Sequence, residues 1–198
     1  PGRDARLEQR GPVAPGTERA EHLVEVGRVE RRKRGVAAQR LVEMGVDMIW
    51  IGDDVVIMEN ALVRGRSRHP VSVGNAVLIG PHTHLNGATV EDEVFIATGA
   101  SLFPGSIAAR GSELRINSVL HVNSRLMPET IIPIGWIAAG NPAQLFSPEQ
   151  HEELWQVQSE LDFPGTVYGV PRDTPMPTIM ARQSEFYGAH RDDQIIER

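Results

Sequence analysis

The sequence predicts a mainly β fold: a left-handed parallel β-helix built from hexapeptide repeats, followed by a C-terminal α-helix and an extended tail. From residue 49 onward an aliphatic residue recurs about every six positions, and a glycine, small or acidic residue often follows it. Only 5% of the residues are aromatic, and small aliphatic side chains suit a narrow tube whose coils stack in layers. Because three hexads make one triangular coil, the pattern favours a solenoid over a β-sandwich with chance alternation.

The aliphatic ladder extends over about ninety residues. Its expected members are Ile51, Ile57, Val63, Val73, Ile79, Leu85, Val90, Ile96, Leu102, Ile107, Leu114, Leu120, Leu126 and Ile132. Each short strand points its aliphatic residue inward, and successive coils stack at the parallel strand spacing of roughly 4.8 Å. This arrangement predicts a triangular tube with a continuous aliphatic interior.

Breaks in the six-residue register predict where the tube departs from regularity. The stretch 64–72 is four residues too long and is expected to form a protruding loop. The step from Leu85 to Val90 has five residues, which shortens one turn. We also expect a short step from Leu102 to Ile107, followed by a step from Ile107 to Leu114 that is one residue too long.

Four segments are expected along the chain. Residues 1–47 form an N-terminal extension, helical or disordered; 48–146 form the β-helix; 147–162 form the C-terminal helix; and 163–198 form the extended tail. Ser147 and Gln150 are spaced as a capping box around Pro148, which suits the first helical position. Prolines at 164, 171, 175 and 177 argue for an extended tail rather than another domain.

The first 47 residues leave two interpretations open. Val36, Ala37 and Leu41 allow a short helix, which favours a helical extension. Alternatively the segment is not native coding, and genuine coding begins near Met44 or Met48. That interpretation is prompted by 19 arginines against a single lysine, a bias typical of GC-rich coding. A peptide from residues 3–40 in the naturally expressed protein would rule it out.

Composition excludes several classes of function. The chain has no cysteine, so disulfides, thiolate metal sites and cysteine nucleophiles are excluded. A formal net charge of -6 argues against binding nucleic acid or an anionic membrane. No run of eighteen apolar residues and no signal-peptide pattern occurs, so we expect a cytoplasmic protein that does not insert into membranes.

A central motif resembles a known family. The run from Ile79 to Ala100, IGPHTHLNGATVEDEVFIATGA, is similar to the central segment of γ-class carbonic anhydrases and their hexapeptide-repeat acetyltransferase-like relatives. That family has a similar five-residue turn here, followed by another coil and a Gly-Ala corner. The closing motif Gly140-Asn141-Pro142-Ala143 and the helix after it are similar too. The resemblance covers about residues 49–162.

The resemblance implies a homotrimer with zinc, iron or cobalt held between subunits by three histidines. The matching positions in this chain are Arg64, Pro81 and Asn86, and none is histidine. A Gln-Asp pair of the family is replaced by Met58-Glu59, and its Arg-Gly-Asp motif is not found. Arginine does not lose its proton and proline offers no ligand, so these residues do not supply the donors that activate a metal-bound water.

Other histidines could rebuild a metal site. His82 and His84 lie within five residues of the altered positions, and His69 lies on the expected loop. Imidazoles are the commonest metal ligands, so one interpretation is zinc or another divalent metal bound by this displaced set, with Glu59 as proton shuttle. The other is that these are surface or interface histidines with ordinary hydrogen bonds. His121 lies two coils from Asn86 on the same face, roughly 10 Å away, too far to share one ion.

Three functions follow from these patterns. The first is a carbonic anhydrase-like lyase that hydrates CO2. The second is a coenzyme A-dependent acyltransferase, with His82 or His84 as base and the loop at Arg66 and Arg68 meeting coenzyme phosphates. The third is a non-catalytic trimeric scaffold. All three predict a homotrimer, and both enzymes take a small-molecule substrate.

Overall fold

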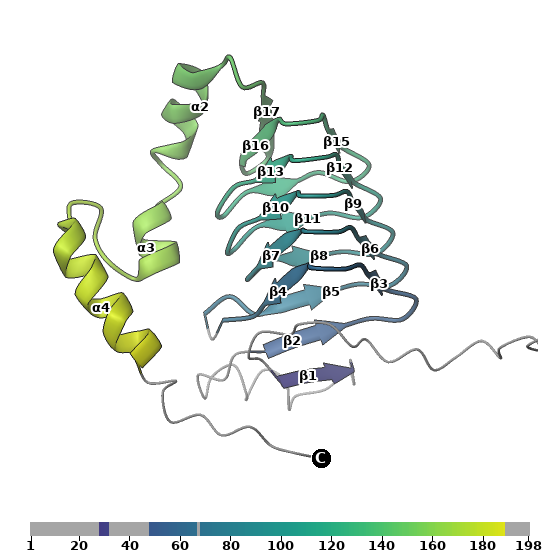
Figure 1. Ribbon diagram of the computed structural model, residues 1–198. Helices are drawn as coiled ribbons and strands as arrows, with labels where there is room; N and C mark the ends of the chain where they lie inside the picture. The colour runs from purple at the N-terminus through teal and green to yellow at the C-terminus, as the bar shows by residue number, and fades with distance from the viewer. Residues whose placement is uncertain (1–27, 32–47, 67, 189–198) are drawn as a thin grey trace, which may run out of the picture.

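The computed structural model describes residues 28–31, 48–66 and 68–188, and it confirms the mainly β fold (Figure 1). The short strands form three sheets, one for each side of a triangular solenoid. The first sheet contains β1 (Arg28–Arg31), β2 (Met48–Ile51), β5 (Val71–Val73), β8 (Thr89–Val90), β11 (Ile107–Ala108) and β14 (Arg125–Leu126). The second contains β3 (Val56–Ile57), β6 (Leu78–Ile79), β9 (Phe95–Ile96), β12 (Glu113–Leu114) and β15 (Ile131–Ile132). The third contains β4 (Leu62–Arg64), β7 (His84–Asn86), β10 (Ser101–Leu102), β13 (Val119–Leu120), β16 (Ile137–Gly140) and β17 (Ala143–Phe146).

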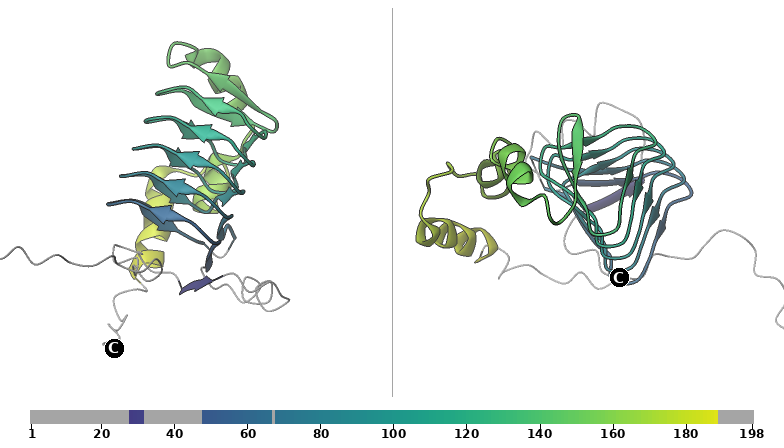
Figure 2. Two further views of the ribbon diagram at one scale, coloured as in Figure 1. Left: turned by 90° about the vertical axis from the view of Figure 1, so that its right-hand side faces the viewer. Right: turned by 90° about the horizontal axis from the view of Figure 1, so that it is seen from above.

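The solenoid is a left-handed parallel β-helix, as expected. Seen from above, the chain winds clockwise from the first sheet to the second and third while it rises toward the viewer (Figure 2). Strands that stack on one another within each sheet are parallel, from the pairing of β2 with β5 up to that of β13 with β16. Their hydrogen bonds therefore join successive coils rather than neighbours in sequence.

The aliphatic ladder forms the core, with one correction. Residues of the ladder stack in three columns, such as Val63, Leu85, Leu102 and Leu120 on the third sheet. On the first sheet the inward residue is Ala108, fully buried and paired with Val90 and Leu126, whereas Ile107 is partly exposed. The expected short and long steps around Ile107 were therefore wrong. Backbone register places Ala108 inward even though Ile107 is the larger apolar residue.

The five-residue step before Val90 is confirmed at a corner of the solenoid. Corners are marked by residues with positive φ, and from Ala76 to Gly135 these recur every six positions except for the five-residue step from His82 to Gly87. Gly87 has φ of +59°, and a Cβ there would come within 2.8 Å of the His69 Cβ. The loop between β4 and β5 therefore folds back onto this corner, and only glycine fits both the conformation and the close approach.

At the lower end of the solenoid, β1 pairs in parallel with β2, so that one strand adds to the first sheet before the ladder begins. The remaining residues of 1–47 lie outside the described residues. At residues 28–31 the structure has this strand instead of the predicted helical or disordered extension. The rest of that prediction falls outside the described residues, and the question of native coding remains a prediction.

At the upper end, the chain reverses after Gly140, and β17 pairs antiparallel with β16. Helix α2 (His151–Gln158) and the turn after it then pack on this hairpin through Leu154, Val157 and Leu161. The helix begins later than the expected Ser147. Gln150 Oε1 accepts a hydrogen bond from the Ser147 N–H at 2.9 Å, but this pair closes a turn ahead of the helix instead of capping its first turn.

The expected extended tail is instead helical over much of its length. It forms α3 (Phe163–Tyr168) and α4 (Met176–Gly188). Pro164 and Pro177 lie in the first turns of these helices, where the missing N–H would have no helical partner in any case. The prolines therefore mark helix starts, and residues 189–198 lie outside the described part.

The three helices lie on one side of the solenoid, beside the third sheet, and the second sheet faces away from them (Figures 1 and 2). None of the described helices has both the length and the apolar character needed to cross a lipid bilayer.

Candidate functional site

The three positions that match the family's metal ligands do not provide a ligand set. Arg64 and Asn86 are direct partners across β4 and β7 on the third sheet. Asn86 is only 7% exposed, and its Oδ1 has no hydrogen-bond partner among the described residues. Pro81 lies at the corner before β7. A protonated guanidinium, a neutral amide and a proline ring do not bind zinc as imidazoles do.

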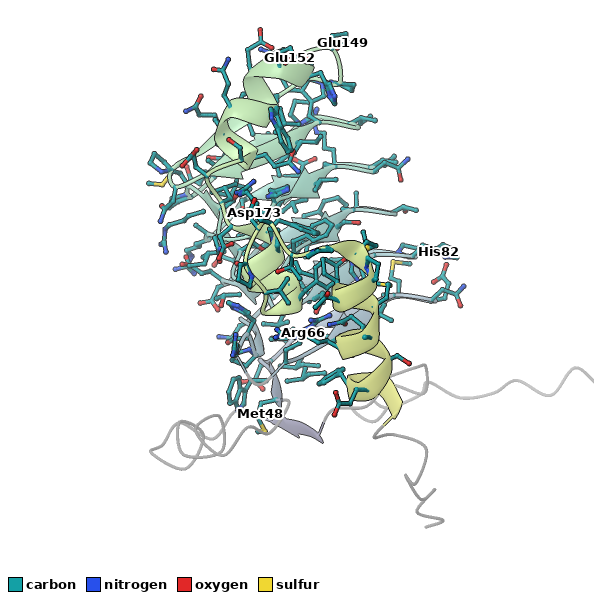
Figure 3. The ribbon with its side chains drawn as sticks, turned by 90° about the vertical axis from the view of Figure 1, so that its left-hand side faces the viewer. Met48, Arg66, His82, Glu149, Glu152 and Asp173 are labelled. Carbon is teal, nitrogen blue, oxygen red and sulfur yellow. The ribbon has the colours of Figure 1, made fainter. Side chains whose placement is uncertain are left out.

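The structure separates the histidines that were expected to replace them. His82 is exposed at a corner with φ of 56°, at the edge of the molecule and away from Arg66 (Figure 3). Glu59, the expected proton shuttle, is exposed at the neighbouring corner, where its backbone carbonyl accepts a hydrogen bond from the His82 N–H at 3.1 Å. His84 lies half-buried on the third sheet, and His69 lies half-buried on the loop before β5. His69 and His84 therefore share the surroundings of Arg66, and His82 and Glu59 do not.

The electrostatics around His69 and His84 oppose binding of a cation. Burial lowers the pKa of His69, and the charges of Arg66 and Arg68 lower it further. Burial also lowers the pKa of His84, with Arg66 and Arg64 adding to the effect. Within the described residues, no three His, Asp or Glu side chains are grouped so that they could hold a metal ion. The residues present in one chain therefore do not fit a zinc ion.

Next to this positive cluster lies a set of packed rings. Phe103 contacts His84 edge-on with ring centroids 6.2 Å apart, and it stacks on His121 at 6.0 Å. Phe163 of α3 covers both Phe103 and His121, and Tyr168 packs against Phe163. His121 is only 6% exposed, and this burial lowers its pKa. A backbone hydrogen bond with Val122 raises the pKa by a smaller amount. Its Nδ1 has no partner among the described residues.

Hydrogen bonds attach α3 to the solenoid from two sites, a corner and the loop between β4 and β5. Asn123, at a corner of the solenoid, donates hydrogen bonds to the Leu161 carbonyl at 2.9 Å and to Thr166 Oγ1 at 2.7 Å. From the loop, Arg66 donates from Nη1 to the Val167 carbonyl at 2.9 Å. Arginine near a helix C-terminus also interacts favourably with the helix dipole. The ring cluster is thus enclosed between the sheet and α3.

The sequence did not indicate the partners Phe103 and Phe163. Phe103 follows the inward Leu102 as His121 follows Leu120, so the register places both on one face. Phe163 lies in the segment that was expected to be extended. Its contact with the sheet depends on the position of α3, which no repeat pattern encodes.

The second sheet carries a different surface, apolar and uncovered by the described helices. Val56 is 55% exposed, Phe95 44% and Ile131 42%, and each precedes an inward residue of the ladder. A shallow depression of about 520 Å³ lies on this side. Its lining residues are Met58, Leu78, Gly80, Pro81, Phe95, Ala97, Thr98, Glu113, Arg115, Ile116 and Ile134. The sequence contains a signal that could have predicted this apolar face. At four positions an outward apolar residue directly precedes the inward one, in the pairs Val56-Ile57, Leu78-Ile79, Phe95-Ile96 and Ile131-Ile132.

Comparison with known proteins supports the resemblance. The chain is 32% identical over 115 residues to γ carbonic anhydrase 1, mitochondrial, of Arabidopsis thaliana, a match that covers 55% of this chain and 40% of that protein. It is 29% identical over 115 residues to γ carbonic anhydrase 2, mitochondrial, of the same plant, covering 55% and 39%. The matched region thus spans about two fifths of these relatives. No family model matches the chain.

Solved structures with some likeness are hexapeptide-repeat transferases. A hexapeptide-repeat-containing acetyltransferase from Vibrio cholerae gives a TM-score of 0.34 at 24% identity, covering 50% of this chain and 61% of that one. A hexapeptide transferase family protein from Anaplasma phagocytophilum gives 0.36 at 18% identity, covering 69% and 81%.

Two features of the fold agree with the sequence matches. The ladder residues form a hexapeptide solenoid, and the five-residue step falls at the motif where the family has its own. Over this region the chain is therefore similar to γ carbonic anhydrases, and it has the hexapeptide-repeat solenoid that the sequence predicted.

Proposed function

We propose that this protein is a non-catalytic homotrimeric scaffold of the γ-carbonic anhydrase-like class that does not hydrate CO2 through a metal. The observation that carries the proposal is the chemistry at the matched ligand positions. Arg64 and Asn86 are partners on the adjacent strands β4 and β7, and proline occupies the third ligand position at Pro81. Hydration of CO2 requires a metal that lowers the pKa of its bound water to near neutrality, and these side chains do not hold such a metal.

The apolar second sheet supports the homotrimer. Its outward residues Val56, Phe95 and Ile131 lie on alternate coils, with Leu78 and Glu113 between them, and are each at least two fifths exposed. Contiguous exposed apolar surface of this kind typically marks an interaction site. Pro81 lines the depression on the same side. A partner subunit on this face would therefore cover Pro81, which agrees with a family ligand position that lies between subunits.

The enclosed ring cluster supports the absence of catalysis. His121 has the lowered pKa of a neutral imidazole, but Phe103 and Phe163 pack against it. An acid-base catalyst needs contact with its substrate. In this arrangement His121 contributes to the packing of α3 against the sheet.

The test is to purify the protein and measure its mass by light scattering, its metal content and its CO2 hydration. We expect about three times the chain mass of 21.8 kDa, no stoichiometric metal and no hydration above the uncatalysed rate. The matched control is the triple variant R64H/P81H/N86H, which restores an imidazole at each matched position and is expected to gain a divalent metal. Stoichiometric metal with hydration activity in the unmodified protein would overturn the proposal, as would a monomeric mass.

A coenzyme A-dependent acyltransferase is the second candidate, favoured by one observation. His84 is half-buried and its pKa is lowered, so an unprotonated base is present at neutral pH beside Arg66. Acetyl-coenzyme A would then raise the melting temperature, because a ligand that binds only the folded state stabilises it. Lack of such a shift at millimolar acetyl-coenzyme A would exclude this candidate.

The cellular compartment also stays a prediction. The sequence led us to expect the cytoplasm, whereas the names of both plant relatives include "mitochondrial". Fractionation of cells that express the protein at its natural level distinguishes the two.

A further inference from the structure

We propose that the loop between β4 and β5 is an oxyanion-binding site, in which Arg66 and Arg68 bind a phosphate or carboxylate group beside His69 and His84. The inference concerns a different part of the molecule from the apolar second sheet. It does not depend on whether the chain forms trimers or lacks a metal.

Positive charge is concentrated at this loop. The charge of Arg66 lowers the pKa of both His69 and His84, and the charges of Arg68 and Arg64 add to this effect at His69 and His84 respectively. Among the described residues, no carboxylate raises the pKa of either histidine. The local potential is therefore positive, in a chain whose net charge is -6. Such a site attracts anions.

Ion pairs between described residues form elsewhere. They join Arg110 to Glu93, Arg115 to Glu113 and Arg125 to Glu91. Within the described part of the chain, neither Arg66 nor Arg68 forms a salt bridge with an acidic side chain. These two arginines are thus left with charge that an external anion can balance.

Arg66 also has hydrogen-bonding capacity that the protein does not use. Its guanidinium has five N–H donors, of which Nη1 donates to the Val167 carbonyl at 2.9 Å. Its Nε is buried and has no partner among the described residues. A buried donor without an acceptor is costly, more so on a charged group. An oxyanion that accepts from Nε would remove that cost.

The backbone holds these groups in place. Arg66 and His69 close the loop with two reciprocal backbone hydrogen bonds, from Arg66 N–H to His69 carbonyl at 2.9 Å and from His69 N–H to Arg66 carbonyl at 3.1 Å. His69 packs on the Gly87 corner, and the Arg66 side chain reaches α3 (Figure 3). Preorganised donors lose less freedom on binding.

The ligand class follows from charge and geometry. The planar fork of a guanidinium matches two oxygens of a phosphate or carboxylate group. Arg68 is exposed, so the site is open to solvent on one side and admits an anionic group that belongs to a larger molecule. Neutral His69 and His84 each add one N–H donor without adding charge.

The experiment titrates the full chain separately with inorganic phosphate, sodium acetate and sodium bicarbonate. Calorimetry measures the binding, and nuclear magnetic resonance records the imidazole proton signals of His69 and His84 at each step. Sodium chloride at equal ionic strength is the reference. We expect phosphate, acetate or bicarbonate to bind at millimolar or lower concentration and to shift both histidine signals. Phosphate binding tighter than the other two identifies a phosphate group, and the reverse order identifies a carboxylate or carbonate.

Two variants and a control locate the site. Arg66→Gln is expected to weaken binding at least roughly tenfold, which corresponds to loss of one charge-assisted hydrogen bond. Arg68→Gln, whose exposed side chain does not support the core, is expected to weaken binding severalfold while the fold stays intact. Arg182→Gln removes the same charge from exposed α4 and should leave affinity unchanged.

The result that overturns the proposal is specific. If none of the three anions binds more strongly than chloride, or if Arg68→Gln and Arg182→Gln weaken binding equally, the loop is not an oxyanion site. A perturbed fold in Arg66→Gln would not affect this decision, since Arg68→Gln tests the site independently.

Discussion

The second and third sheets share one interior and differ completely on the outside. Both point large aliphatic residues inward at six-residue intervals, for example Ile96 on the second sheet and Leu102 on the third. Outward, the second sheet presents Phe95 and Ile131 to solvent, whereas the third presents His84, His121 and arginines under α3. The residue next to each ladder position therefore decides what a face binds, and the ladder itself decides only the fold.

Substitutions in the shared ladder should have the largest effect because they weaken both faces together. Leu102→Ala removes a fully buried side chain that stacks on Leu85 and Leu120. We expect the free energy of unfolding to fall by about 2–5 kcal/mol, measured by urea denaturation. Met127→Ala, at a residue that is 47% exposed, serves as control and should stay within about 0.5 kcal/mol. Equal effects of the two substitutions would contradict an interior built on the ladder.

A charge on the second sheet should break the assembly and leave the third sheet intact. Phe95→Asp places a carboxylate in the centre of the exposed apolar face, next to Leu78 across the strand pair. We expect association to weaken by about 2 kcal/mol or more per contact, so that light scattering at micromolar concentration reports monomers. Circular dichroism should be unchanged. Thr166→Asp, on α3 of the opposite side, is the comparison, and dissociation there instead would assign the interface to the helical side.

Loss of the corner contact should loosen α3 without affecting the trimer. Asn123→Ala removes the two hydrogen bonds to Leu161 and Thr166. We expect a loss of about 1 kcal/mol in stability and faster amide exchange in α3, with the oligomeric mass unchanged. Unaltered exchange in α3 would show that Arg66 alone is sufficient to hold the helix.

Acid should weaken the third sheet by a smaller amount. The pKa values of His69, His84 and His121 are lowered in the folded protein, so the unfolded chain binds protons more readily. Stability should therefore decrease as the pH falls below the ordinary histidine pKa of 6.5, and the loss should stop growing once the pH is below the folded values. Melting temperatures between pH 7.5 and 5 measure this dependence. The double variant H84Q/H121Q is expected to flatten the profile, and a wild-type profile that is already flat would refute the linkage.

The fold was readable from the sequence because the repeat is local. The six-residue spacing from one inward residue to the next identifies each ladder position in the sequence. The five-residue step at Gly87 appears in the sequence as well as in the corner conformations. The error at Ile107 has the same origin, since side-chain size suggested one residue and backbone register selected the next.

The functional surroundings were harder to predict because they depend on contacts between distant segments. His84, Arg66 and His69 were noticed as chemistry-bearing residues, but their mutual position depends on how the loop folds over Gly87. The cover provided by Phe163 depends on α3, and the prolines that begin α3 and α4 were interpreted as signs of an extended chain. Sequence periodicity does not describe either arrangement.

The reversal of direction between β16 and β17 also limits self-association. The last coil of a parallel solenoid leaves a row of unpaired backbone groups on which another coil of the same kind could add, as in a growing fibril. After Gly140 the chain turns back, so the final strand Ala143–Phe146 runs against the winding and carries α2 on the same hairpin. A second molecule then meets a strand of the wrong polarity at this end, and stacking of whole solenoids into filaments is discouraged.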